Sequence, residues 1–330
     1  MALSVSVIVV TRDRPQLLAA ALASVVVQSP APLEVRIGDD GGGTAAAVAE
    51  AVVLLEVTVL PLSCGQPGAA RNAAAREAQG DYLAFLDQDD QWHPLHLEKL
   101  AAPLGADPGV GWVYCDFDEM DFDGNLVTRA FICKQGICHP KQTIYDCVAG
   151  DLMVLPSASV IRRAAFEQAG GFDEALCGYE DDDLFVRFFR LGWEHVFLAR
   201  PLVRFRIHTR GSSTSPRFME SRLRYAAKLV SILPDDSRMF RYYVSLAIAP
   251  RFFLTSLDDY VRACSARDWE GARHALQAVN HFAALRRRSL RLRWKLAWIQ
   301  RPRLFRFLIS LNDRLPYRVR FMRNPTVTLH

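Results

Sequence analysis

Residues 4–90 alternate short apolar runs with alanine-rich segments, and this alternation constrains the fold more than any other feature of the chain. Residues 4–10 form a continuous β-branched apolar run, typical of a strand buried on both faces of a parallel sheet. We expect further strands at 33–37, 53–60 and 82–86, and helices at 17–27, 44–51 and 69–78. Strands that alternate with helices in this way predict an α/β, doubly wound sheet. Residues 112–132 predict a hairpin of two strands with a turn at 123–125.

Acidic side chains follow two of these strands. Asp39 and Asp40 come after the run 33–37, and Asp87-Gln88-Asp89-Asp90 follows the run 82–86. Doubly wound sheets bind ligands at the carboxyl ends of their strands. In extended backbone, an Asp-Xaa-Asp (DXD) motif holds two carboxylates about 7 Å apart, and such oxygen ligands suit Mg²⁺ or Mn²⁺ shared with phosphate. Taken alone, an Asp-Xaa-Asp tripeptide more often consists of solvated loop acids than of metal ligands. Asp39-Asp40 alone could equally be an ordinary Asx-type turn.

Three further groups of side chains could join such a site. Arg71 lies on a helix just after Pro67-Gly68, where its guanidinium could bind a diphosphate or face solvent. A helix is expected from about Glu180, and its four successive acids exceed what capping requires, so one of them could act as a general base. His208 follows the strand-like residues 196–198 and could ligate a cation, although a lone histidine is more often structural.

Taken in order, these pieces resemble the family 2 glycosyltransferases, which are inverting enzymes of the GT-A fold. The resemblance covers residues 4–210, roughly two thirds of the chain, and the ordered set is far more specific than any single motif. The matching stretches are Val7 to Arg14, Gly38 to Gly41, Gly68 to Asn72, Tyr82 to Asp90, Gly170 to Glu174, and Glu180-Asp181.

The resemblance implies a GT-A doubly wound mixed sheet over residues 1–215, with a Rossmann-like nucleotide-binding half and an acceptor half. A helical, arginine-rich region would follow over 216–330. Asp39 would accept a hydrogen bond from the base of a nucleotide-sugar donor, with Thr11 and Arg71 nearby.

The resemblance also assigns the reaction. Asp87 would bind the donor ribose, and Asp89 would bind a divalent metal, Mn²⁺ or Mg²⁺, that bridges the diphosphate, with His208 as a further ligand. Asp181 would deprotonate the acceptor hydroxyl, which would attack the anomeric carbon and invert it. Asp181 is chosen over the two acids that follow it because it comes directly after Glu180.

Two departures from the family pattern touch the nucleotide end of this site. Asp13 stands where the family often has Asn, and Gly42 stands where Ser often follows Asp-Asp-Gly. They leave the base preference open, although a UDP-sugar is the donor we expect first. The expected acceptor is a saccharide or a lipid-linked group, in cell-surface polysaccharide or glycoconjugate synthesis.

The alternative enzyme class is a metal-dependent nucleotidyltransferase, which would also hold metal with acids on a related sheet. It does not account for Glu180-Asp181 after Gly170 to Glu174, and the glycine-rich loop usual after the first strand of those enzymes is missing. A dinucleotide oxidoreductase is disfavoured because no GxGxxG follows that strand, and the sequence contains no P-loop.

The segment 286–323 is strongly basic. It has thirteen Arg or Lys and one acid, a net charge of +12, which leaves −8 for the rest of a chain whose total is +4. Arginines alternate with Trp294, Trp298 and Phe305, as in basic amphipathic helices of membrane interfaces. We expect docking to an anionic membrane surface; packing on the acidic body is the open alternative, and nucleic-acid binding is not expected.

The location of the chain is predicted from what its sequence lacks. The apolar run 4–10 has no basic n-region before it and is far shorter than the 20 or so residues that span a bilayer. The seven cysteines are scattered without a CxxC pair, which favours reduced thiols over a disulfide framework. We therefore expect a cytoplasmic protein, peripheral at the inner face of the membrane if the basic segment docks there.

Overall fold

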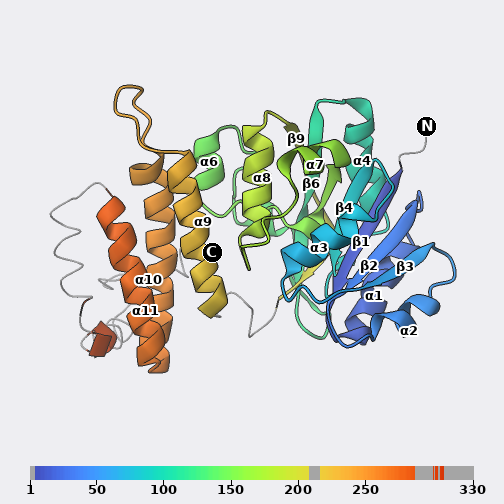
Figure 1. The fold of residues 1–330 in the computed structure, drawn as a ribbon, viewed down its shortest axis with the longest axis horizontal. Coiled ribbons are helices and arrows are strands. Elements are labelled where there is room, and N and C mark those ends of the chain that lie inside the picture. The colour runs from blue at the N-terminus through green and yellow to red at the C-terminus, as the bar shows by residue number, and fades with distance from the viewer. Residues whose placement is uncertain (1–3, 208–215, 287–299, 301, 304, 308–330) are drawn as a thin grey trace. The chain divides into compact units, whose positions relative to one another are not determined.

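The computed structural model describes residues 4–207, 216–286, 300, 302–303 and 305–307, which form two compact units (Figure 1). One unit comprises residues 1–144 and 152–221, and the other comprises 145–151 and 222–330. His208 lies outside the described residues, as does most of the basic segment 286–323.

The first unit is built on a mixed sheet, in which the described strands follow the order β3-β2-β1-β4-β8-β6-β9-β5, with β7 paired to β6. Strands β3, β2, β1 and β4 are parallel and lie side by side in Figure 1, whereas β8 runs antiparallel between β4 and β6. The predicted doubly wound mixed sheet is therefore confirmed. The strands are β1 (Val5–Thr11), β2 (Glu34–Asp39), β3 (Val57–Pro61), β4 (Tyr82–Asp87), β5 (Gln91–Trp92), β6 (Val110–Met120), β7 (Leu126–Thr128), β8 (Ser159–Arg162) and β9 (Glu194–Arg206).

Helices connect the strands of this sheet. They are α1 (Pro15–Val26), α2 (Ala45–Glu50), α3 (Pro67–Arg76), α4 (His96–Ala106), α5 (Phe131–Lys134), α6 (Ile144–Val148), α7 (Arg163–Ala169) and α8 (Glu180–Arg190). Helices α1 and α3 both begin at a proline, which suits the first helical turn because the N–H that proline lacks would be unpaired there anyway. Most of α6 belongs to the second unit.

The strand register brings the polar strand ends together. Thr11 lies opposite Asp39 across β1 and β2, and Val10 lies opposite Asp87 across β1 and β4. Strands β1 and β2 are buried along nearly their whole length, so the sheet is a rigid support. Three of the predicted site residues therefore lie on one edge of the sheet.

Two expectations about local structure are wrong. Strand β3 begins at Val57 and not at 53, because Val53 and Leu54 lie in a turn with 86% and 75% of their surface exposed. The strand after the hairpin turn ends at Thr128 and does not reach 132. Ala130 adopts a left-handed conformation, and the Asp116 carboxylate accepts the N–H of Ile132, so the chain enters α5 instead.

The second unit is helical, as predicted for the region after 217. It contains most of α9 (Pro216–Ile232), a π-helical turn at Val244–Ile248, α10 (Ala249–Ala266) and α11 (Trp269–Leu285). Phe252 stacks on Phe282 with 5.5 Å between ring centroids, and Arg222 pairs with Asp259. Among the described residues, no helix is long and apolar enough to cross a bilayer.

Candidate active site

The DXD segment turns immediately after β4. Asp87 is the last residue of β4, and the Asp90 N–H donates to the Asp87 carbonyl at 3.1 Å. The motif is therefore not extended, so the carboxylate separation of about 7 Å expected for extended backbone does not apply. The chain reverses here to enter β5. The side chains of Asp87 and Asp89 are 28% and 21% exposed, so both carboxylates remain accessible.

Gln88, the middle residue of the motif, links this turn to β1. Its amide oxygen accepts the Thr11 hydroxyl at 2.7 Å and the Arg12 N–H at 2.9 Å. The Thr11 hydroxyl thus holds the end of β1 against the DXD turn. Sequence reasoning missed Gln88, because nothing in its own neighbourhood indicates that β1 ends beside it.

Asp90, for which the sequence suggests no role, is buried and accepts the Arg206 N–H at 3.0 Å. Burial raises its pKa well above the usual value, and the charges of Asp87 and Asp89 raise it further. The Arg206 guanidinium donates to the Asp89 carbonyl at 3.0 Å and to the Phe122 carbonyl at 2.6 Å. Arg206, which sequence reasoning also missed, therefore joins the DXD turn to the β6–β7 hairpin.

Arg71 joins the end of β4 to the start of α8. Its guanidinium donates to Asp87 at 2.6 Å and to Glu180 at 3.1 Å, and lies over the Phe172 ring at 5.4 Å. Burial alone would lower the Arg71 pKa, but the charges of Asp87, Glu180 and Asp181 outweigh it and raise that pKa. Two segments that are distant in sequence thus meet at one buried cation.

The four acids that open α8 have different surroundings. Glu180 is buried and also accepts the Gly178 N–H at 2.6 Å, while Asp182 accepts the Leu152 N–H at 3.3 Å. Asp183 is buried in an ion pair with Arg187 at 2.8 Å. Asp181 is half-buried, so among the three consecutive aspartates it is the one with an accessible side chain.

Asp39 and Asp40 bind the backbone of their own edge of the sheet. The Asp39 carboxylate accepts the N–H groups of Gly41 and Ala45, each at 3.2 Å. Asp40 accepts the N–H groups of Cys64 and Gly65, which follow β3. Asp39 therefore has the arrangement of an Asx-type turn, with its carboxylate bound to the N–H two residues on, whereas Asp40 ties the loop after β2 to the loop after β3.

The two departures from the family pattern touch each other. The Gly42 N–H donates to the Asp13 carboxylate at 2.7 Å, and a Cβ atom at Gly42 would collide with the same carboxylate oxygen. Asp13 itself adopts a left-handed conformation, with φ of 51°. Where it lies, the Asp13 carboxylate therefore leaves no room for a side chain at position 42, and the two residues together form one rim of the site.

Among the described residues, no three His, Cys, Asp or Glu side chains are placed to hold a metal ion by themselves. Asp87 and Asp89 still provide two accessible carboxylates in one turn, and Arg14 lies 3.4 Å from Asp89. Mg²⁺ is usually bound by one or two carboxylates together with substrate phosphates, so this donor set fits such a cation.

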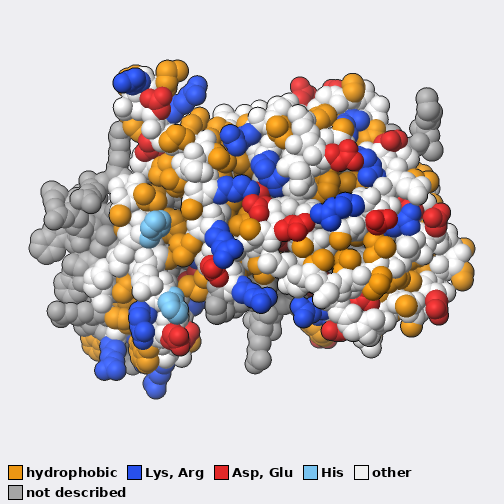
Figure 2. Space-filling view, in the orientation of Figure 1, with side chains coloured by type: hydrophobic (Ala, Val, Ile, Leu, Met, Phe, Trp, Pro, Cys, Tyr) orange, Lys and Arg blue, Asp and Glu red, His pale blue; other side chains and the backbone are white. Residues whose placement is uncertain are grey.

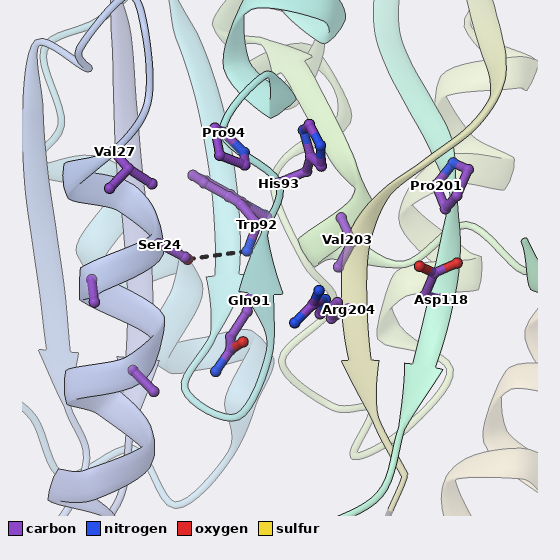
Figure 3. A pocket seen from close by; sticks show the side chains of 12 residues that line it. Ser24, Val27, Gln91, Trp92, His93, Pro94, Asp118, Pro201, Val203 and Arg204 are labelled. Carbon is purple, nitrogen blue, oxygen red and sulfur yellow. Dashed lines mark hydrogen bonds between the residues drawn. The ribbon is translucent and has the colours of Figure 1, made fainter. Parts of the chain in front are cut away.

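A hollow of about 480 Å³ lies apart from these acids, between α1 and strands β5 and β9 (Figure 3). Its lining includes Ser24, Trp92, His93 and Arg204. The backbone N–H of Trp92 donates to the Ser24 hydroxyl at 3.0 Å, as the dashed line in Figure 3 marks. None of the DXD or α8 acids lines this hollow, so it is not the candidate active site.

The comparisons with known proteins agree with this geometry. The model of the family described as glycosyl transferase family 2 matches residues 6–169. An uncharacterised glycosyltransferase of Bacillus subtilis, YwdF, is 28% identical over 186 residues, 56% of this chain and 68% of YwdF. The amylovoran biosynthesis glycosyltransferase AmsB of Erwinia amylovora is 25% identical over 221 residues, 64% of this chain and 72% of AmsB.

Two solved structures share the fold. TarS of S. aureus, in complex with UDP-GlcNAc, has a TM-score of 0.62 at 18% identity, over 94% of this chain and 92% of that chain. The mannosyltransferase PcManGT of Pyrobaculum calidifontis, in complex with GDP-Man and Mn²⁺, has a TM-score of 0.55 at 21% identity, over 98% and 85%. The sequence matches lead to one conclusion, with which the shared fold agrees: this chain is a glycosyltransferase and belongs to glycosyl transferase family 2.

Proposed function

We propose that this enzyme transfers a sugar from a nucleoside diphosphate donor to an acceptor hydroxyl, with inversion at the anomeric carbon. The observation that supports this most directly is the Arg71 bridge. By pairing with Asp87 and Glu180, Arg71 holds the end of β4 beside the start of α8. A donor-binding edge and a candidate base are thereby kept in one site.

On this proposal the donor nucleotide lies along the carboxyl ends of β1, β2 and β4. Asp39 accepts a hydrogen bond from the base, Thr11 lines the same end, and Asp87 accepts hydrogen bonds from the ribose. Arg71 lies toward the nucleotide and fixes Asp87, since its guanidinium already binds that carboxylate. These residues orient the donor so that its anomeric carbon faces α8, which reduces the entropic cost of the reaction.

Asp181 would be the general base. It accepts the acceptor hydroxyl proton while the acceptor oxygen forms a bond to the anomeric carbon on the face opposite the diphosphate. The bond from that carbon to the diphosphate oxygen breaks, and nucleoside diphosphate leaves. Asp181 suits this role better than Asp182 or Asp183, because those carboxylates are buried and are used by Leu152 and Arg187.

A divalent cation, Mn²⁺ or Mg²⁺, fits the accessible carboxylates of this turn, with Asp89 as the main ligand. When bound there, such a cation would offset the negative charge that develops on the leaving diphosphate. His208, outside the described residues, is retained as a proposed further ligand. Arg14, which lies 3.4 Å from Asp89, adds positive charge on the same side.

The donor, the acceptor and the location are inferred from the structural neighbours, the relatives and the basic segment. One structural neighbour is in complex with UDP-GlcNAc and another with GDP-Man, so a nucleoside diphosphate sugar is the donor class, with UDP-sugars to be tried first. The similarity to AmsB, whose name refers to amylovoran biosynthesis, favours a saccharide or lipid-linked acceptor in polysaccharide synthesis. Binding of 286–323 to an anionic membrane would bring the enzyme to such acceptors.

The test compares Asp181→Asn with wild type for nucleotide binding and for sugar transfer. Labelled UDP-sugars with Mn²⁺ and a bacterial lipid extract supply donor and acceptor. We expect the variant to bind UDP normally and to lose transfer at least about a hundredfold, the range typical of a lost general base.

The control is Asp123→Asn, which makes the same change at an exposed hairpin residue and should transfer sugar like wild type. Normal transfer by Asp181→Asn would refute the role of the base. Absence of nucleotide binding in wild type would refute the proposed function itself.

A further inference from the structure

A loop projects from the second unit between α9 and the π-helical turn, and it appears in orange at the top of that unit in Figure 1. Residues 234–241 are all exposed. At its tip, Met239 and Phe240 have 59% and 83% of their surface exposed. Two adjacent large apolar side chains at the tip of a projecting loop are a candidate interaction surface, and unlike the exposed pair Val53 and Leu54 they have arginines beside them in the sequence.

The loop has a fixed shape. Asp236 and Arg241 exchange backbone hydrogen bonds of 2.7 and 2.9 Å across its neck. The Asp236 carboxylate accepts the Arg238 N–H at 2.9 Å and the Met239 N–H at 3.3 Å. Phe240 has a φ of 53°, a left-handed conformation that is unfavourable for a bulky side chain. The neck therefore holds the apolar tip in a conformation that the tip alone would not favour.

The loop carries two aspartates and two arginines. Arg238 and Arg241 flank the tip, and among the described residues neither has an ion-pair partner. Asp235 accepts the Val244 N–H at 2.7 Å at the base of the loop, whereas the Asp236 carboxylate lies against the tip, where it accepts the N–H groups of Arg238 and Met239. Figure 2 shows hydrophobic, basic and acidic side chains together on this projection. The tip thus combines an apolar pair with two guanidinium groups.

We infer that this loop inserts into the surface of an anionic lipid bilayer. Phe and Met can bury their side chains at the boundary between headgroups and acyl chains, as apolar residues of interfacial proteins do. Arginines beside them can bind lipid phosphates through their planar donor groups, and an anionic leaflet attracts each basic residue. Among the described residues neither arginine has an ion-pair partner, so both guanidinium groups are available to lipid phosphates beside an inserted tip.

The inference does not depend on the sugar-transfer reaction, and it concerns different residues from the basic segment 286–323. Stable attachment by interfacial elements usually takes two signals. A loop that inserts and a basic segment that binds electrostatically would together supply them.

The experiment measures binding of the full chain to vesicles of phosphatidylcholine with about one third phosphatidylglycerol, by co-sedimentation. The variant Met239→Ser/Phe240→Ser should bind about tenfold more weakly, because one aromatic and one thioether side chain no longer enter the interface. Arg238→Gln/Arg241→Gln should weaken binding to these vesicles but not to pure phosphatidylcholine vesicles.

The matched control is Val53→Ser/Leu54→Ser, which removes an equally exposed apolar pair from the first unit and should bind like wild type. Thermal unfolding checks that each variant is folded, and UDP binding should be unchanged in all of them. Wild-type vesicle binding by Met239→Ser/Phe240→Ser would overturn the inference. Loss of self-association with unchanged vesicle binding would also overturn it, and would make the loop a contact between copies of this chain.

Discussion

At the scale of single residues, the candidate site depends on a few buried polar groups that each bind more than one segment. Arg71 binds two carboxylates from elements that are 109 and 16 residues away in sequence. Gln88 accepts two hydrogen bonds from the end of β1. Such groups are costly to leave unpaired, so their partners fix the positions of the acids that would touch substrate.

Replacing Arg71 by Ala should strongly destabilise the first unit. The change leaves the buried Glu180 carboxylate without its cation, and removing one partner of a buried ion pair costs about 3–5 kcal/mol. Arg76→Ala is the control, because Arg76 is 69% exposed and its pair with Glu174 is of the kind worth about 0–1 kcal/mol. Urea unfolding measures both. Equal free energies of unfolding would show that the Arg71 bridge contributes little.

His96 should make stability depend on pH. It is buried and stacked on Trp92, and burial lowers its pKa from 6.5 to about 3. The unfolded state therefore takes up a proton before the folded state does, so stability falls as pH drops from about 6.5 toward 3.

For this group alone, the expected loss between pH 7 and pH 5 is about 2 kcal/mol. His96→Gln should reduce the slope of unfolding free energy against pH, measured by urea titration at several pH values. A slope in His96→Gln equal to that of wild type would contradict the assignment.

At the scale of elements, apolar periodicity predicts those strands and helices whose buried face follows a local sequence pattern. The strands β1, β2 and β4 and the helices α3 and α8 were predictable, because each has an apolar face of the right period or a clear start signal. The start of β3 and the helix α5 were not. Val53 and Leu54 are apolar but exposed, and α5 depends on the carboxylate of Asp116 in a distant strand.

The same limit applies to the site. Its acids stand at strand ends and helix starts, positions that a sequence reveals. Arg206 and Gln88 bind backbone atoms of segments that are distant in sequence, and no local sequence pattern predicts those contacts. The sequence therefore predicts the groups that would meet substrate better than the groups that hold them in place.

Arg206→Ala should loosen the contact between the DXD turn and the β6–β7 hairpin. It removes the donors to the Asp89 and Phe122 carbonyls, so amides in 88–90 and 121–125 should exchange hydrogen faster. We expect UDP affinity to fall about tenfold, as for second-layer partners of ligand sites. The exposed neighbour Arg204 is the control, since Arg204→Ala should change neither measurement. Unchanged exchange at both turns in Arg206→Ala would show that they are held by other contacts.

At the scale of the whole molecule, the chain combines an α/β unit with the candidate site and a helical unit with the projecting loop. The acid-rich edge belongs entirely to the first unit. A donor and its cation are therefore expected to stabilise that unit directly, because a ligand that binds only the folded state adds its binding free energy to stability. Measuring unfolding with and without ligands thus tests the site before any acceptor is known.

UDP with Mn²⁺ at about a hundred times its dissociation constant should add roughly 2.7 kcal/mol to stability, a rise of a few degrees in Tm for a chain of this size. Removing the metal with EDTA should abolish most of the rise, since without the metal the UDP diphosphate would face the Asp87 and Asp89 carboxylates with Arg71 and Arg14 as the remaining cations. Asp89→Asn should abolish the metal-dependent part, whereas Asp123→Asn should keep it. GDP and ADP in the same assay show which nucleobase the site prefers, from the size of the rise in Tm. If no nucleoside diphosphate raises Tm in the presence of Mn²⁺ or Mg²⁺, then Asp39, Asp87 and Asp89 do not form a donor site, and their shared edge of the sheet has another use.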